Sequence, residues 1–285
     1  MQRVLSTYLF LNHRLTATLL EEISRAGFPQ IEIFCSRYHF DYSSPQRARE
    51  LGDWLEAHQL ALHSLHAPTD RDTGPMRDSG LPVSISDPER VRRLDSVDEV
   101  KRALDVAETV PFRYLVQHIC SSHDAMDARR WDAAFSSLEH LIVFAKQRGV
   151  TVVLENTPHE MATPPSLRRF IEETRLHDLR LCFDVGHAHI QDGVAAGIES
   201  MGDLVVTTHV HDNHGESDEH LLPFEGTVDW NAAAKLLSRG LPAVLELKEH
   251  LADVHAAEPA PALDALRAAH QALDRLENML AAKPS

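Results

Sequence analysis

Three features of the sequence predict an α/β fold, a single (β/α)₈ TIM barrel occupying residues 1–285. Eight short apolar runs are separated by longer amphipathic stretches, which is the alternation expected of strands and helices around a parallel sheet. Several of these runs are continuously apolar, as strands covered on both faces are. The chain of 285 residues is close to the length that eight such units and their loops require.

The predicted strands lie at residues 4–10, 31–34, 60–66, 113–118, 151–155, 179–184, 204–211 and 242–248. Apolar residues recur at helical spacing in the intervening stretches, for example at 96–110, 131–145 and 263–280. A doubly wound open sheet is the alternative, but no glycine-rich nucleotide-binding turn follows an early strand. The segment 69–84 is too long for a simple connection, and we expect it to cover the mouth of the barrel.

The composition, 43% hydrophobic and 25% charged, is typical of a soluble globular protein. No apolar run approaches the roughly 20 residues of a membrane span, and no secretory signal peptide is evident. The odd number of dispersed cysteines, Cys35, Cys120 and Cys182, favours reduced thiols in a cytoplasmic protein. A net charge of −15 disfavours nucleic acid as a partner, so we expect the substrate to be a small molecule. The sequence does not set the oligomeric state, so a homo-oligomer stays open.

Histidines and acids gather at the ends of the predicted strands, most densely in "HVHDNHGESDEH" at 209–220. Active sites of such barrels form where the strands end. An unpaired charge at the mouth of an apolar barrel is costly, and this set contains no Lys or Arg. A single His or Glu at a strand end is usually structural, but the joint placement favours bound divalent metal. The residues concerned are His66, His118, Glu155, Asp184, His187, His209, His211, Asp218, His220 and Glu246.

The segments "SLHAP", "LENTP", "FDVGHAHI", "HVHDN", "SDEH" and "LEL" resemble the xylose-isomerase-like TIM barrels. This superfamily includes sugar phosphate isomerases and epimerases and the endonuclease-IV-type apurinic endonucleases of AP endonuclease family 2. The resemblance extends from about the second predicted strand to the eighth. Its motifs are specific for the superfamily and not for one activity.

The resemblance implies two sets of metal ligands. The centre shared by isomerases and epimerases is matched by Glu155, Asp184, His209 and Glu246. The further ligands of the endonuclease-type members are matched by His66, His118, His187, Asp218 and His220. One to three metals per chain are therefore implied, with two or three favoured. Zn²⁺ or Mn²⁺ is expected, and Fe²⁺ and Co²⁺ also suit these ligands. His211 and His187 are expected to contact the substrate.

The favoured activity is a metal-dependent isomerase or epimerase acting on a sugar or sugar phosphate, with a metal-stabilised enediolate. The resemblance implies that Glu155 and Glu246 transfer the proton. Ketose 3-epimerase-like members carry an Arg where this chain has Gly215, which argues against a simple ketose epimerase. The alternative is a multinuclear zinc phosphodiesterase or apurinic endonuclease, which the nine matched ligands favour. A non-catalytic metal or sugar binder is a third possibility.

Overall fold

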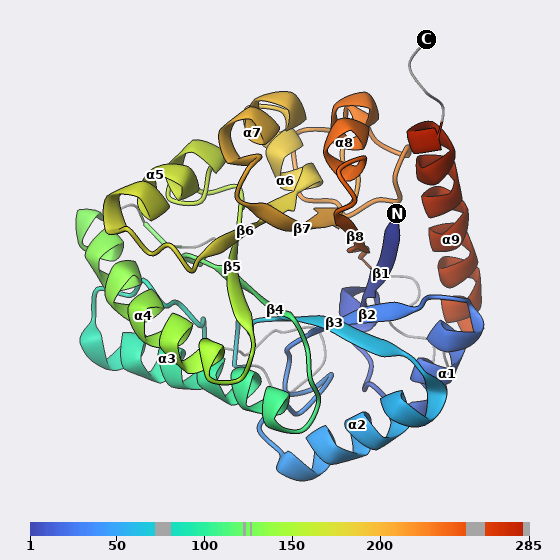
Figure 1. Ribbon diagram of the computed structural model, residues 1–285, viewed down its shortest axis with the longest axis horizontal. Coiled ribbons are helices and arrows are strands. Elements are labelled where there is room, and N and C mark those ends of the chain that lie inside the picture. The colour runs from blue at the N-terminus through green and yellow to red at the C-terminus, as the bar shows by residue number, and fades with distance from the viewer. Residues whose placement is uncertain (72–80, 122–123, 126, 249–259, 282–285) are drawn as a thin grey trace.

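Eight parallel strands form a closed barrel in the computed structural model, which describes all residues except 72–80, 122–123, 126, 249–259 and 282–285 (Figure 1). Each strand pairs with its neighbours in chain order, and the last pairs with the first. The strands are β1 (Gln2–Ser6), β2 (Gln30–Phe34), β3 (Ala61–His66), β4 (Tyr114–His118), β5 (Thr151–Glu155), β6 (Arg180–Asp184), β7 (Val205–Val210) and β8 (Pro242–Leu245). The predicted (β/α)₈ fold is confirmed, and the open sheet is excluded.

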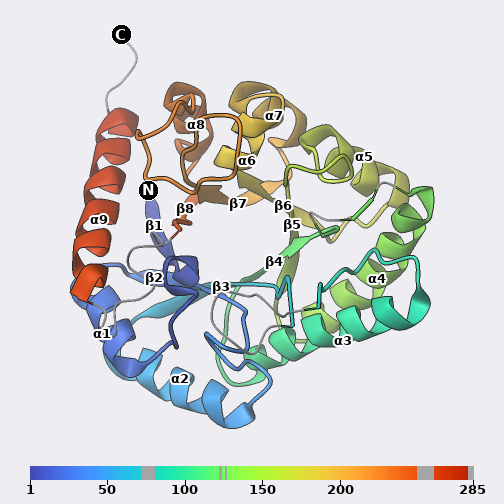
Figure 2. The same cartoon turned by 180° about the vertical axis from the view of Figure 1, so that it is seen from behind.

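Helices surround the barrel on its outside, as both views show (Figure 2). They are α1 (Ala17–Arg25), α2 (Pro45–His58), α3 (Arg90–Asp105), α4 (Ala128–Lys146), α5 (Pro164–Thr174), α6 (Val185–Ile190), α7 (Val194–Met201), α8 (Trp230–Leu237) and α9 (Ala260–Ala281). Two 3₁₀ helices, η1 (Thr7–Phe10) and η3 (Val106–Glu108), also occur. The helix α9 packs against α8 and α1, and Arg3 of β1 lies 2.6 Å from Glu277 of α9. This ion pair helps to hold the last helix against the first strand.

Most predicted strands agree with the structure to within two residues at each end, but the first and the last extend too far at their C-terminal ends. The first strand ends at Ser6 because the Ser6 side chain accepts a hydrogen bond from the Tyr8 N–H, which starts η1. The last strand ends at Leu245, although the Glu246 N–H still donates to the Val210 carbonyl at 3.2 Å. Most of the segment 69–84, which we expected to cover the mouth, lies outside the described residues.

The interior of the barrel fixes which side chains reach the mouth. A small apolar cluster fills part of the interior and contains Tyr114, Val116, Val153 and Cys182. Side chains two residues apart on a strand point the same way. His118, Glu155 and Asp184, each two residues beyond a member of this cluster, therefore also face the interior, at the strand ends.

The three cysteines are free and buried, in agreement with the sequence prediction. Among the described residues, no helix combines the length and the apolar character that crossing a membrane requires.

We expect Leu138→Ala in α4 to lower the free energy of unfolding by about 3 kcal/mol, because a buried leucine is replaced by a cavity. Leu138 is fully buried, whereas Val143 of the same helix is 60% exposed and provides a matched control. Val143→Ala should change the free energy by less than about 0.5 kcal/mol. Denaturant titration measures both, and a small loss for Leu138→Ala would contradict the described packing of α4.

Candidate metal centre

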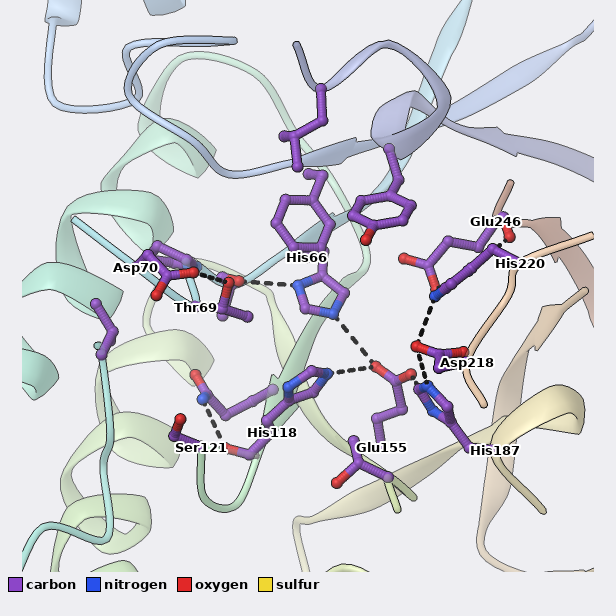
Figure 3. A pocket seen from close by; sticks show the side chains of 18 of the residues that line it. His66, Thr69, Asp70, His118, Ser121, Glu155, His187, Asp218, His220 and Glu246 are labelled. Carbon is purple, nitrogen blue, oxygen red and sulfur yellow. Dashed lines mark hydrogen bonds and ion pairs between the residues drawn. The ribbon is translucent and has the colours of Figure 1, made fainter. Parts of the chain in front are cut away.

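Ten histidine and carboxylate side chains converge at the mouth of the barrel in three groups of candidate metal ligands. Figure 3 labels those that line the pocket. Within each group, the ligand atoms all lie within 4.8 Å of one another. The central group contains Glu155, Asp184, His209 and Glu246. The β3–β4 group contains His66, His118 and again Glu155, and the loop group contains His187, His211, Asp218 and His220.

In the central group, three buried carboxylates surround one imidazole nitrogen. His209 Nδ1 lies 3.2 Å from Glu155 Oε1, 3.2 Å from Glu246 Oε2 and 3.8 Å from Asp184 Oδ2. All four side chains are buried. Among the described residues, these carboxylates form ion pairs with histidines and with no Lys or Arg. A divalent ion would supply the missing positive charge.

Glu155 connects the central group to the β3–β4 group. Its Oε2 lies 3.3 Å from His66 Nε2 and 3.2 Å from His118 Nε2, while its Oε1 faces His209. Figure 3 shows the Glu155 carboxylate beside both of these strand-end histidines. The two oxygens therefore belong to different groups, which is the arrangement of a bridging carboxylate.

In the loop group, Asp218 lies between two imidazoles (Figure 3). Its Oδ2 is 2.9 Å from His220 Nε2 and 3.3 Å from His187 Nε2. The His211 ring stacks on His220 with centroids 4.0 Å apart, and His211 Nε2 lies 3.1 Å from Asp184 Oδ1. The loop group thus touches the central group through Asp184.

Backbone carbonyls orient three of these histidines. His66, His187 and His220 each have Nδ1 within hydrogen-bond distance of a carbonyl oxygen, and a carbonyl can only accept. Nδ1 therefore carries a proton, and Nε2 faces a carboxylate; once Nε2 is deprotonated, its lone pair would be available to a metal. The carbonyls are those of Ala67, Asn156 and Glu246, at 2.8, 2.9 and 3.0 Å respectively.

Buried polar atoms that lack hydrogen bonds show whether the site could accommodate metal ions. Within the described part of the chain, Asp184 Oδ2 and both ring nitrogens of His211 are buried and make no hydrogen bond, although His211 Nε2 lies 3.1 Å from Asp184 Oδ1. Leaving such atoms unsatisfied is costly, and a metal ion would satisfy them. Imidazole and carboxylate are ligands that Zn²⁺, Mn²⁺, Fe²⁺ and Co²⁺ accept. The side chains therefore fit divalent metals.

The electrostatics favour ionised carboxylates. Burial opposes ionisation of Glu155, but His209 and His118 outweigh it and hold the pKa of Glu155 well below its ordinary value. Burial likewise opposes the charge of Asp218, and its hydrogen bonds with His187 and His220 hold its pKa far below the usual range. Both carboxylates are thus deprotonated at neutral pH, as metal ligands must be.

The loop after β7 is built around the buried carboxylate of Asp212. This carboxylate accepts hydrogen bonds from the N–H groups of Asn213, Val228 and Phe224 and from the Trp230 indole, at 2.9, 3.0, 2.9 and 2.9 Å. Asp212 also forms an antiparallel bridge with Leu221. The bridge returns the chain to the end of β7 and places Asp218 and His220 beside the site.

A glycine makes room for His211. A Cβ atom at Gly186 would lie 2.1 Å from the His211 ring, so no other residue fits there without displacing the ring. The glycine of "FDVGHAHI" is therefore a packing requirement of the loop group.

A cavity of about 560 Å³ opens onto all three groups, and Tyr8 and Phe34 contribute aromatic rings to its wall. This volume suits a small ligand. Lys248 is the only Lys or Arg among the described residues that line it.

The nine residues predicted as ligands are brought together. His211, expected only to contact substrate, lies among the candidate ligands of the loop group. Sequence reasoning missed Glu32, which is fully buried and contacts His209. A glutamate inside the apolar run "IEIF" was the available signal.

The chain belongs to the xylose isomerase-like TIM barrel family, whose model matches residues 20–276. The uncharacterized protein MJ1311 of Methanocaldococcus jannaschii is 28% identical over 255 residues, covering 85% of this chain and 82% of that protein. Among solved structures, a D-tagatose 3-epimerase-like protein has a TM-score of 0.76 at 23% identity, covering 98% of this chain and 97% of its own. The IolI protein with a bound zinc atom has a TM-score of 0.73 at 16% identity, covering 97% and 98%. These structural likenesses establish the fold.

We expect Asp212→Ala to lower the free energy of unfolding by about 3 kcal/mol or more, because four donors, most of them buried, lose their acceptor. The control is Asp229→Ala, in the exposed N-cap of α8, which accepts from the N–H groups of Asn231 and Ala232. The control should cost about 1 kcal/mol. Denaturant titration compares the two, and equal losses would contradict a central structural role for Asp212.

Proposed function

We propose that this chain is a divalent-metal-dependent isomerase or epimerase acting on a sugar or sugar phosphate. One observation carries the proposal: Glu155 and Glu246 lie equally close to His209 Nδ1, each at 3.2 Å, where a small-molecule cavity meets the central group. They come from β5 and from the end of β8, which are not neighbouring strands. The D-tagatose 3-epimerase-like protein has the same fold, which supports this reaction class.

Two carboxylates on different sides of a substrate carbon can remove a proton and return one. When bound by the central group, a divalent metal supplies positive charge that stabilises the negative charge left on the substrate. Glu246 is the better placed base because it makes fewer ion pairs within the described residues. Its partners are His209 at 3.2 Å and His220 at 3.9 Å. Glu155 contacts four histidines and is the more constrained of the two.

Metal-assisted hydrolysis of a phosphodiester is the second candidate. The observation that favours it is the presence of the β3–β4 and loop groups beside the central group, with Glu155 shared. Clustered metals activate water and stabilise the leaving oxygen in such reactions. Glu155 would then be a bridging ligand and would not move a proton. The net charge of −15 argues for a small phosphodiester over nucleic acid.

We expect Glu246→Gln to reduce turnover at least about 100-fold, because the amide cannot accept a proton from carbon. The assay is exchange of a carbon-bound proton with deuterated water, followed by NMR over a panel of ketoses and sugar phosphates. Glu219→Gln is the matched control, since Glu219 pairs with the exposed His214 in the neighbouring loop. Near-native exchange by metal-loaded Glu246→Gln would contradict the assigned role.

The same protein should be tested on phosphodiesters, including abasic-site DNA. We expect no hydrolysis above that of a metal-stripped sample. Efficient hydrolysis that tracks metal content, without proton exchange on any sugar, would favour the second candidate.

The loop group leads to a separate prediction about the number of metal ions that each chain binds. The double change Asp218→Ala, His220→Ala should lower the metal-to-protein ratio by about one while the barrel stays folded, because only loop-group ligands are lost. Elemental analysis of purified protein measures the ratio, and circular dichroism checks the fold. A native ratio of one metal per chain, or an unchanged ratio in the variant, would leave the loop group without a metal.

A further inference from the structure

A carboxylate that no mechanism above uses lies inside the barrel behind the central group. Glu32 of β2 is fully buried. Its Oε2 accepts hydrogen bonds from Ser64 Oγ at 2.7 Å and from His209 Nε2 at 3.3 Å, and its Oε1 lies 3.2 Å from the same nitrogen. Within the described residues, His209 is its ion-pair partner, and no Lys or Arg reaches it. A buried carboxylate with so little compensation is costly.

Glu32 and the carboxylates of the central group lie on opposite sides of the His209 imidazole ring. The Nε2 edge of His209 faces Glu32, while the Nδ1 edge faces Glu155 and Glu246. An ionised carboxylate only accepts hydrogen bonds, so Nε2 donates its proton to Glu32. In the neutral ring, the lone pair of His209 would therefore be on Nδ1, on the side of the three carboxylates of the central group.

His209 differs in this respect from three other candidate ligands. Backbone carbonyls hold Nδ1 of His66, His187 and His220, and leave Nε2 facing a carboxylate. His209 is held at Nε2, by a full negative charge. A carboxylate behind a ligating imidazole increases its basicity as well as fixing its orientation.

The strands that carry Glu32 and His209 are irregular near the contact between these two residues. The β2–β3 register shifts between Ile31 and Glu32, which leaves His63 as an extra residue on β3. The β6–β7 register shifts just before Thr207, two residues ahead of His209. Such shifts are rare in parallel sheets and re-aim side chains. His63 Nε2 lies 3.2 Å from Thr207 Oγ1, so the two irregular regions are in contact across the barrel.

We propose that Glu32 is a positioning residue, which fixes the orientation and tautomer of His209 and thereby strengthens metal binding at the central group. The inference rests on the metal-dependent function proposed above. A metal held by His209 would compensate part of the cost of burying the Glu32 carboxylate.

The test measures Co²⁺ affinity by competition with a chromogenic chelator, in the full chain. Glu32→Gln keeps an acceptor oxygen but removes the charge, and Glu32→Leu removes both. We expect Co²⁺ binding to weaken about 10-fold in the first and about 100-fold in the second. The visible absorption of bound Co²⁺ should also change in Glu32→Leu, because the geometry of the His209 ligand changes.

The control is Glu99→Gln. Glu99 is an equally buried carboxylate on α3, paired with Arg37 and Arg102 at 2.6 Å each and not a member of any ligand group. We expect it to lower thermal stability and to leave Co²⁺ affinity and absorption unchanged.

Wild-type Co²⁺ affinity and absorption in both Glu32 variants would overturn the inference. Equal weakening in Glu99→Gln would also overturn it, because the effect would then be general destabilisation. A wild-type protein that binds no Co²⁺ would overturn the proposed function together with the inference, so the two failures are distinguishable.

Discussion

The structure depends on how four buried carboxylates are neutralised. These carboxylates lie inside the barrel or at its mouth and belong to Glu32, Glu155, Asp184 and Glu246. Within the described residues, their ion-pair partners are histidines. Imidazoles can offset these charges by taking up protons or by sharing metal ions with them. The orientation of the rings also suits metals, because backbone carbonyls and Glu32 hold one nitrogen and leave the other facing a carboxylate with which it can share an ion.

Glu155 links this constraint to function. With a metal in the central group alone, the second oxygen of Glu155 would stay beside the histidines of β3 and β4, and the carboxylate could exchange protons with a substrate. Metals in both groups would occupy both oxygens and make Glu155 a bridge. In the proposed account, proton transfer on a sugar and hydrolysis of a phosphodiester are alternative reactions at this site, and the number of groups that hold a metal would decide between them.

Much of the fold was predictable from sequence, because parallel strands buried on both faces are continuously apolar and the helices between them are amphipathic. The strand-end residues His118, Glu155 and Asp184 were predictable for the same reason, since all strands of such a barrel end on one face. The end of the first strand was not, because it depends on the Ser6 side chain capping η1. Nor was Glu32, whose contact with His209 joins residues far apart in the chain.

The central claim is that the mouth of the barrel binds divalent metals through these side chains. Anomalous diffraction at the zinc edge, from crystals grown with Zn²⁺, tests it most directly. The account predicts a peak in the central group and at least one more in a neighbouring group, each about 2.0–2.3 Å from imidazole nitrogens and carboxylate oxygens. A map with no peak at the mouth, or with peaks only at surface histidines, would contradict it.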